Sequence, residues 1–170
     1  ITEGHALKGV LKADMENIRS TMEKIDYNTF EDVVNNIFAA KRIYIIGLRS
    51  SMALAEFLGF YLNIILQNVK TVGYGISDIF EQMINVGEGD LVIGIGFPRY
   101  ASRTIDALAF AQDRGATVVA VTDSFLSPLA ARADYSLIAQ SNMASFVDSL
   151  VAPLSVINAL IIAVGMREKE

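Results

Sequence analysis

Two short turns in this sequence carry the residue types that bind phosphate. The first is Gly47-Leu48-Arg49-Ser50-Ser51, and the second extends from Gly96 to Thr104. Each turn combines arginine with hydroxyl side chains. Arginine binds phosphate through two parallel hydrogen bonds, hydroxyls donate to phosphate oxygens, and a helix that starts at the turn offers unpaired backbone N–H groups. The turns therefore predict an anion-binding site.

The predicted site takes residues from both turns. The candidate contacts are Gly47, Arg49, Ser50, Ser51, Arg99, Tyr100, Ser102 and Thr104. A structural alternative stays open at each turn: the glycine only makes the turn, and a serine, Ser102 at the second turn, only caps a helix. Glu81 and Asp123 are lesser candidates, because a carboxylate reaches ligand hydroxyls but repels phosphate. Neither turn matches G-x-G-x-x-G or a Walker loop, so nucleotide ligands lose their main support.

Short apolar runs precede these turns and alternate with helical segments. The predicted strands are 42–47, 69–72, 91–95, 117–121 and 135–138, and the helices that follow are 51–67, 77–84, 102–114 and 146–166. Strands buried on both faces are continuously apolar, so the pattern predicts an α/β fold whose parallel sheet is covered by helices on both sides. Ligands of such sheets bind beyond the carboxyl ends of the strands. The segments placed there are 47–51, 73–78, 96–104 and 122–128.

Three further helical features are expected. Apolar residues recur at three- and four-residue intervals from Leu7 to Ile25, which predicts an amphipathic helix over 6–25. Asn28 or Thr29 is expected to cap the next helix. The apolar segment 146–166 contains polar residues and a proline, so we expect a buried helix there and not a membrane span.

Composition restricts the class of protein. The 170 residues fit one domain, and the chain has no cysteine and a single histidine, His5, so few metal ligands exist and a cytoplasmic protein is expected. The net charge of -5 does not supply the basic surface that nucleic-acid binding needs. Because Ile1 is not a start methionine and no signal-peptide pattern follows, we expect a piece of a longer chain.

Several motifs together resemble the sugar-isomerase (SIS) domain family, in particular the effector domain of RpiR-type bacterial transcriptional regulators. The resemblance covers about residues 29–164. It rests on Ile45-Ile46-Gly47-Leu48-Arg49-Ser50-Ser51, Asp90-Leu91-Val92-Ile93-Gly94-Ile95, Phe97-Pro98-Arg99-Tyr100, Arg114-Gly115-Ala116, Thr122-Asp123-Ser124 and Ser127-Pro128-Leu129-Ala130. The second turn departs from the family pattern Ser-x-Ser-Gly-x-Thr, because Gly96 and Pro98 stand where its two serines would be.

This resemblance implies a fold, a ligand class and partners. The fold is a three-layer α/β/α sandwich with a five-stranded parallel sheet, flavodoxin-like, with residues 1–28 as a linking helix and residues 29–170 as the phosphosugar-binding domain. The ligand is a sugar phosphate, and the domain forms dimers or tetramers. DNA is bound only by a helix-turn-helix domain upstream of this segment. No cofactor, metal or membrane is implied.

The sequence favours a sensor over an enzyme. An aldose–ketose isomerase needs a positioned base, and the candidates are His5, Asp78 and Glu81. His5 is expected to be solvated or capping, and Asp78 to supply charge at a helix start. A phosphosugar isomerase or lyase stays the alternative. A third interpretation is a dimerisation module built on helices 6–25 and 146–166, and it is compatible with sensing.

Overall fold

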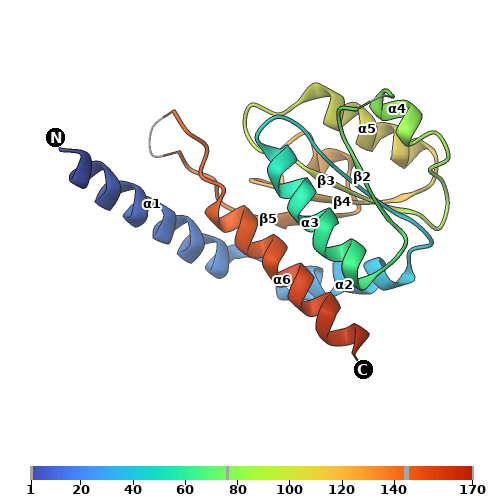
Figure 1. Ribbon diagram of the computed structural model, residues 1–170, viewed down its shortest axis with the longest axis horizontal. Helices are drawn as coiled ribbons and strands as arrows, with labels where there is room; N and C mark the ends of the chain where they lie inside the picture. Colours follow the sequence, from blue (N-terminus) through green and yellow to red (C-terminus); the bar gives the residue numbers. More distant parts are fainter. Residues whose placement is uncertain (1, 76, 144–145, 170) are drawn as a thin grey trace.

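Five parallel strands form a single sheet in the order β2-β1-β3-β4-β5 in the computed structural model, which describes residues 2–75, 77–143 and 146–169 (Figure 1). The strands are β1 (Ile43–Gly47), β2 (Val69–Val72), β3 (Leu91–Ile95), β4 (Thr117–Thr122) and β5 (Tyr135–Ile138). The five predicted strands are confirmed, with β1 starting one residue later and β4 ending one residue later than expected.

Helices cover both faces of this sheet, which confirms the three-layer sandwich. The helices are α1 (Glu3–Lys24), α2 (Tyr27–Ala39), α3 (Ser51–Ile65), α4 (Ile79–Gln82), α5 (Ser102–Asp113) and α6 (Val151–Glu168), with a 3-10 turn at Ala130–Arg132. Side chains of α2, α3 and α6 form one core cluster with the sheet, and those of α4 and α5 form the other. Alternate residues of β1 supply the two clusters, Ile43 and Ile45 on one side, Tyr44 and Ile46 on the other.

Several helix boundaries differ from expectation: α1 covers 3–24 in place of 6–25, α3 ends at 65 in place of 67, and α6 starts at 151 in place of 146. Asp26 caps α2, where Asn28 or Thr29 was predicted, because the Asp26 carboxylate accepts hydrogen bonds from the Asn28 backbone N–H at 2.9 Å and from the Thr29 hydroxyl at 3.1 Å. Helix α4 is much shorter than the predicted 77–84. Asp78 caps it by accepting from the Phe80 N–H, which confirms the structural role expected of Asp78.

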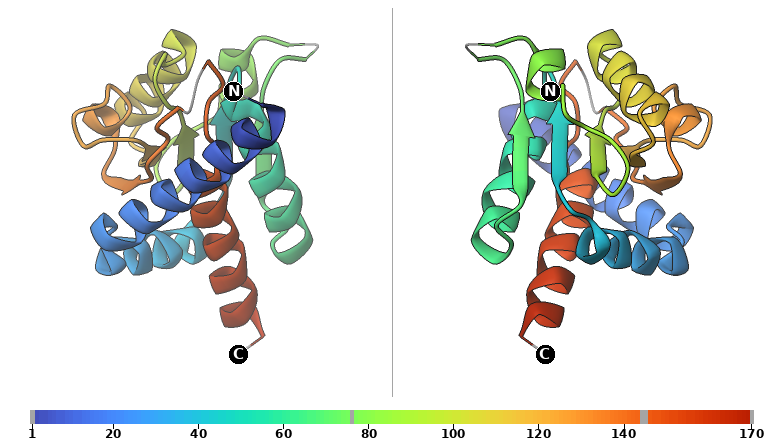
Figure 2. Two further views of the ribbon diagram at one scale, coloured as in Figure 1. Left: turned by 90° about the vertical axis from the view of Figure 1, so that its left-hand side faces the viewer. Right: turned by 90° about the vertical axis from the view of Figure 1, so that its right-hand side faces the viewer.

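Helix α1 is formed as predicted and extends away from the sheet, packing along α6 (Figure 1, Figure 2). Its apolar stripe does not enter the core. The exposed apolar residues of α1 are Leu7, Val10, Leu11, Met15, Ile18 and Met22. The buried residues of this helix are polar, Asn17 and Thr21.

Helix α6 is only partly the buried helix that was expected. One face packs in the core through Val156, Ile157, Leu160 and Val164, whereas Ile162 and Met166 are exposed on the other. Among the described residues α6 is the one helix long and apolar enough to cross a membrane, a test of length and composition that core helices of soluble proteins also pass.

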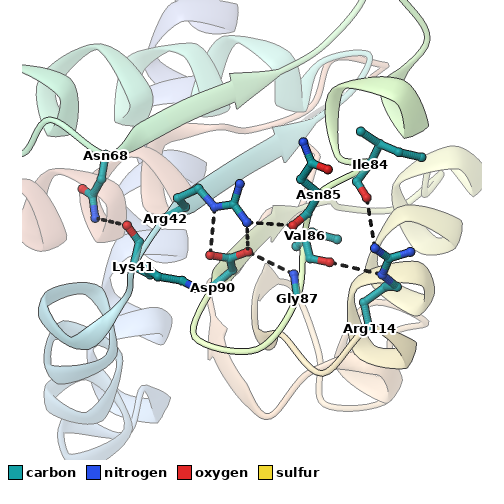
Figure 3. Close-up of polar contacts among 9 residues, drawn as sticks. All are labelled: Lys41, Arg42, Asn68, Ile84, Asn85, Val86, Gly87, Asp90 and Arg114. Atoms are coloured by element: carbon teal, nitrogen blue, oxygen red, sulfur yellow. Dashed lines mark hydrogen bonds and ion pairs between the residues drawn. The ribbon is translucent and has the colours of Figure 1, made fainter.

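A polar network ties together the ends of the strands opposite to the predicted site (Figure 3). The buried carboxylate of Asp90 accepts hydrogen bonds from Arg42 Nε at 3.2 Å, from Arg42 Nη2 at 3.0 Å and from the Gly87 N–H at 3.0 Å. The hydrogen bonds to Asp90 raise the pKa of the Arg42 guanidinium. Because Arg42 precedes β1 and Asp90 precedes β3, this network fixes these two neighbouring strands relative to each other.

Candidate ligand-binding site

The first predicted turn lies where the strand order reverses. From β1 the chain continues to β2 on one side, while β3 lies on the other, and ligands of open α/β sheets bind at such a point. The turn is closed by hydrogen bonds from the Ser51 N–H to the Leu48 carbonyl and from the Met52 N–H to the Arg49 carbonyl, each 3.1 Å. The β1–α3 turn therefore presents its side chains at the carboxyl edge of the sheet.

Two backbone features of this turn are costly for most residues. Arg49 has a φ of 59°, in the left-handed region that non-glycine residues rarely adopt. At Gly47 a Cβ atom would lie 2.6 Å from the Ser51 carbonyl oxygen, so only glycine lets the start of α3 approach β1 this closely. Gly47 therefore shapes the turn, and it does not line the cavity described next.

A cavity of about 130 Å³ brings the two predicted turns together. We call it the anion cavity, and its lining residues are Leu48, Arg49, Ser50, Ser51, Ile95, Gly96, Phe97, Pro98, Arg99, Ala101 and Asp148. Arg49 and Arg99 bring two positive charges and Asp148 one negative charge, so the lining carries net positive charge. The Ser50 hydroxyl donates to Asp148 Oδ2 at 2.9 Å. The residue set suits a phosphate group.

The start of α5 also borders the anion cavity. Ala101 occupies the N-cap position and has no side chain that can accept a hydrogen bond, so the structural alternative, that Ser102 only caps this helix, is wrong. Ser102 is the first helical residue, exposed, and lies outside the cavity lining. A helix start without a capping side chain leaves N–H groups and a positive dipole end for an anion.

Tyr100 and Thr104 point away from the anion cavity lining. The Tyr100 hydroxyl donates to Asp123 Oδ1 at 2.6 Å, and burial, followed by this hydrogen bond, raises the pKa of Tyr100. Thr104 is buried, and its hydroxyl has no hydrogen-bond partner within the described parts of the chain. Tyr100 thus positions Asp123, whereas the Thr104 side chain lies on the buried face of α5.

A second cavity of about 270 Å³ adjoins the first, because Pro98 and Asp148 line both. We call it the polar cavity, and its lining residues are Pro98, Asp123, Gln140, Ser141, Asn142, Met143 and Asp148. Carboxylates, amides and a hydroxyl are the groups that hydrogen-bond sugar hydroxyls. The site thus separates a cationic part from a part rich in neutral and acidic acceptors.

Comparison with known proteins identifies the family. The model of the SIS domain family matches residues 36–163. The chain belongs to the SIS domain family. The sugar isomerase domain of an RpiR transcription factor from Sphaerobacter thermophilus is 32% identical, with a TM-score of 0.90 over 94% of this chain and 89% of that one.

One further relative of this SIS domain is named as a regulator, and one further structure shares its fold. An uncharacterized HTH-type transcriptional regulator of Haemophilus influenzae is 31% identical over 121 residues, which are 71% of this chain and 42% of that protein. The chain thus spans less than half the length of this relative. The Vibrio vulnificus NanR protein complexed with ManNAc-6P shares the fold, at 19% identity and a TM-score of 0.80 over 92% of this chain and 61% of that one.

The sequence did not predict the residues after β5 that line the two cavities. Gln140, Ser141 and Asn142 directly follow this strand, and Asp148 precedes α6. The rule that ligands bind beyond the carboxyl ends of parallel strands also applies to the fifth strand. Applied there, it would have found the polar run 140–142. No local signal marks Asp148.

Two candidate residues, Glu81 and His5, lie elsewhere. Glu81 is exposed on α4 and lines neither cavity. His5 is exposed on α1, where Nδ1 lies 2.7 Å from the Thr2 hydroxyl, which confirms a solvated or capping histidine. In the segment 122–128, Ser127 accepts a hydrogen bond from the Ala130 N–H at 3.1 Å and precedes the 3-10 turn, so it has a structural role there.

Proposed function

We propose that this SIS domain binds a sugar phosphate, with the phosphate in the anion cavity and the sugar hydroxyls in the polar cavity. One observation carries the proposal: the arginines lie in one cavity, and Asp123 lies in the adjoining one. Asp123 is thereby kept away from the phosphate, and the two arginines outweigh the single carboxylate, Asp148, that also lines the anion cavity. Arg49, Ser50, Ser51 and Arg99 are the proposed phosphate contacts, helped by the start of α5.

We further propose that ligand binding serves regulation of transcription. Support comes from the HTH-type and RpiR relatives, and from a net charge of -5 that gives this segment no DNA-binding surface of its own. In this proposal residues 1–28 link residues 29–170 to an upstream helix-turn-helix domain, and the protein works in the cytoplasm.

A binding experiment tests the ligand class. Glucose 6-phosphate, ribose 5-phosphate and ManNAc-6P are first screened by thermal shift, because a ligand that binds only the folded state raises the melting temperature. Calorimetry then compares Arg99→Ala with Arg132→Ala, a matched control on the exposed 3-10 turn. Loss of charge-assisted hydrogen bonds, about 1.5–3 kcal/mol, predicts a Kd at least tenfold weaker for Arg99→Ala only. Equal affinity of both variants would remove Arg99 from the site.

An isomerase is the second candidate, favoured by one observation. The Asp148 carboxylate lines both cavities and is held by Ser50, as a positioned base would be. Turnover of any of the three sugar phosphates by the wild-type domain, abolished in Asp148→Asn with binding retained, would establish this function in place of a sensor. A domain that binds these compounds without turnover supports the sensor.

We also propose that the domain assembles as a dimer or tetramer. The exposed apolar stripe of α1 borders an apolar groove of about 440 Å³ between α1, α2 and α6, lined by Ile18, Met22, Tyr27, Phe30 and Val156 among others. A surface of this kind is typical of an interface between subunits. Light scattering at micromolar concentration should give at least twice the monomer mass, and the double change Leu11→Glu with Met15→Glu should lower it. A monomeric wild type would refute assembly.

A further inference from the structure

The two residues that helix α1 buries are polar, whereas its large apolar residues are exposed, the reverse of a helix that packs by hydrophobic contact. Asn17 is 2% and Thr21 6% exposed, whereas Met15 is 70% exposed. Burying polar side chains is costly unless their hydrogen bonds are satisfied. The partners of these two residues therefore indicate what this face of α1 is for.

The Thr21 hydroxyl donates to the Asn17 carbonyl within α1 at 2.8 Å, and the other side-chain partners lie in the segment between β5 and α6. Asn17 Nδ2 donates to the Asn142 carbonyl at 3.0 Å, and the Asn142 N–H donates back to Asn17 Oδ1 at 3.2 Å. The Gln140 N–H donates to the Thr21 hydroxyl at 2.9 Å, and the Ser149 hydroxyl donates to Asp14 Oδ1 at 2.8 Å. Asp14, Asn17 and Thr21 follow at intervals of three and four residues, so they share one face of α1. We call these three residues the polar seam.

The backbone that the polar seam holds is the backbone that lines the ligand site. Gln140 and Asn142 each line the polar cavity, and Ser149 follows Asp148, which lines both cavities. The polar seam therefore forms hydrogen bonds to the same segment whose residues line the polar cavity.

Hydrogen bonds of this kind respond to small movements of that wall. They weaken steeply when distance or angle changes, whereas apolar side chains can slide past one another with little loss. The two Asn17 bonds form a reciprocal pair with one residue, so a shift of Asn142 disturbs both together. If α1 were held only by its packing against α6, a shift of Asn142 would not change how strongly α1 is docked.

We propose that sugar phosphate binding and the docking of α1 are coupled through the polar seam, so that an occupied site holds α1 firmly and an empty site holds it weakly. This inference rests on the proposed function. Ligand and polar seam stabilise the same arrangement of residues 140–142 and 148–149, and coupling between two such events is reciprocal in free energy. Disrupting the seam should therefore weaken the ligand, and adding the ligand should tighten α1.

The test uses this chain and the probes glucose 6-phosphate, ribose 5-phosphate and ManNAc-6P. Calorimetry compares wild type with Thr21→Val and Asn17→Ala, and Asn63→Ala on the exposed side of α3 is the matched control. Losing about 1 kcal/mol of hydrogen bonding predicts a Kd roughly fivefold weaker for the two seam variants. Thr21→Ser keeps the hydroxyl and should bind like wild type, as should Asn63→Ala.

Amide hydrogen exchange of the wild type supplies a second measurement that needs no variant. The probe that binds most tightly should slow exchange at the Gln140 and Asn142 amides and along residues 14–21 by at least threefold. If a probe binds the wild type but the seam variants bind within twofold of it and exchange in 14–21 does not change, the coupling is wrong while the proposed function stands. If none of the probes binds, the proposed function fails and the coupling fails with it.

Discussion

Replacing Arg49 by glycine should raise the stability of the folded domain and lower the affinity of the domain for phosphate. Arg49 has a φ of 59°, and its side chain lines the anion cavity. Glycine adopts this backbone conformation without steric cost, but it carries no guanidinium. Arg49→Gly is therefore expected to stabilise the folded domain and weaken ligand binding at the same time.

The expected gain in stability follows from the backbone alone. A non-glycine residue in the left-handed conformation destabilises the folded state by roughly 1–2 kcal/mol, and glycine removes this strain. Glycine also gives the unfolded chain more conformational freedom, which lowers the stability of the folded state by about 0.4–1 kcal/mol. The net gain is about 0.5–1 kcal/mol. For a domain of this size, 1 kcal/mol corresponds to about 2–4 °C in the melting temperature, so we expect an increase of about 1–4 °C.

The expected loss of affinity follows from the charge-assisted hydrogen bonds of one guanidinium. These are worth about 1.5–3 kcal/mol, which predicts a Kd weaker by roughly ten- to a hundredfold for the sugar phosphate that the screen identifies. Calorimetry measures the affinity, and thermal unfolding without ligand measures the stability.

Arg49→Lys is the matched control, because it keeps a positive charge and the strained backbone conformation. Its melting temperature should equal that of the wild type, with an affinity between those of the wild type and Arg49→Gly. A lower melting temperature for Arg49→Gly would show that the left-handed turn is not strained. Unchanged affinity would show that Arg49 is not a phosphate contact.

Three further predictions concern residues whose surroundings the structure defines. Asp90→Asn should destabilise the fold by about 1–3 kcal/mol in chemical denaturation, because the buried carboxylate loses its charge-assisted bonds to Arg42, and ligand affinity should stay the same because this network lies at the other end of the sheet. Thr104→Val should raise the melting temperature without changing affinity, since it replaces a buried hydroxyl that lacks a partner among the described residues by a methyl group of similar size; weaker binding would instead place Thr104 in the site. The pKa of Tyr100 is raised in the folded state by burial and by its bond to Asp123, so its contribution to stability is complete below its unfolded pKa near 10 and is lost as pH rises above it. Between pH 10 and 11 the Tyr100→Phe variant should therefore lose less unfolding free energy than the wild type, and equal losses would contradict the raised pKa.

Local pattern was sufficient to predict the architecture. The three inner strands β1, β3 and β4 are short apolar runs that are buried almost throughout, and Gly47 at the end of β1 admits the close approach of the next helix. These properties depend on residues that are close in the sequence, so the local pattern predicted the strands and the long helices. The short α4 could not, because its length depends on the cap at Asp78.

The same local pattern found only part of the candidate site. Arginine and serine after a strand are visible in the sequence, and Arg49, Ser50, Ser51 and Arg99 do meet in one cavity. Whether a turn residue faces that cavity depends on the direction in which its helix leaves the sheet. This is why neighbouring residues of the second turn separate, with Arg99 in the cavity and Thr104 in the interior.

By itself, then, the sequence determined the parallel α/β fold and the two phosphate-type turns, since both follow from short-range chemistry. Only the tertiary structure decided that the segment after β5 lines a cavity beside the two turns and that α1 binds this segment through polar side chains. Asn17 and Asn142 are 125 residues apart, and no hydrophobic pattern predicts a hydrogen bond between them. Their pairing arises because α6 brings the β5–α6 segment alongside α1, which is a consequence of how the helices pack.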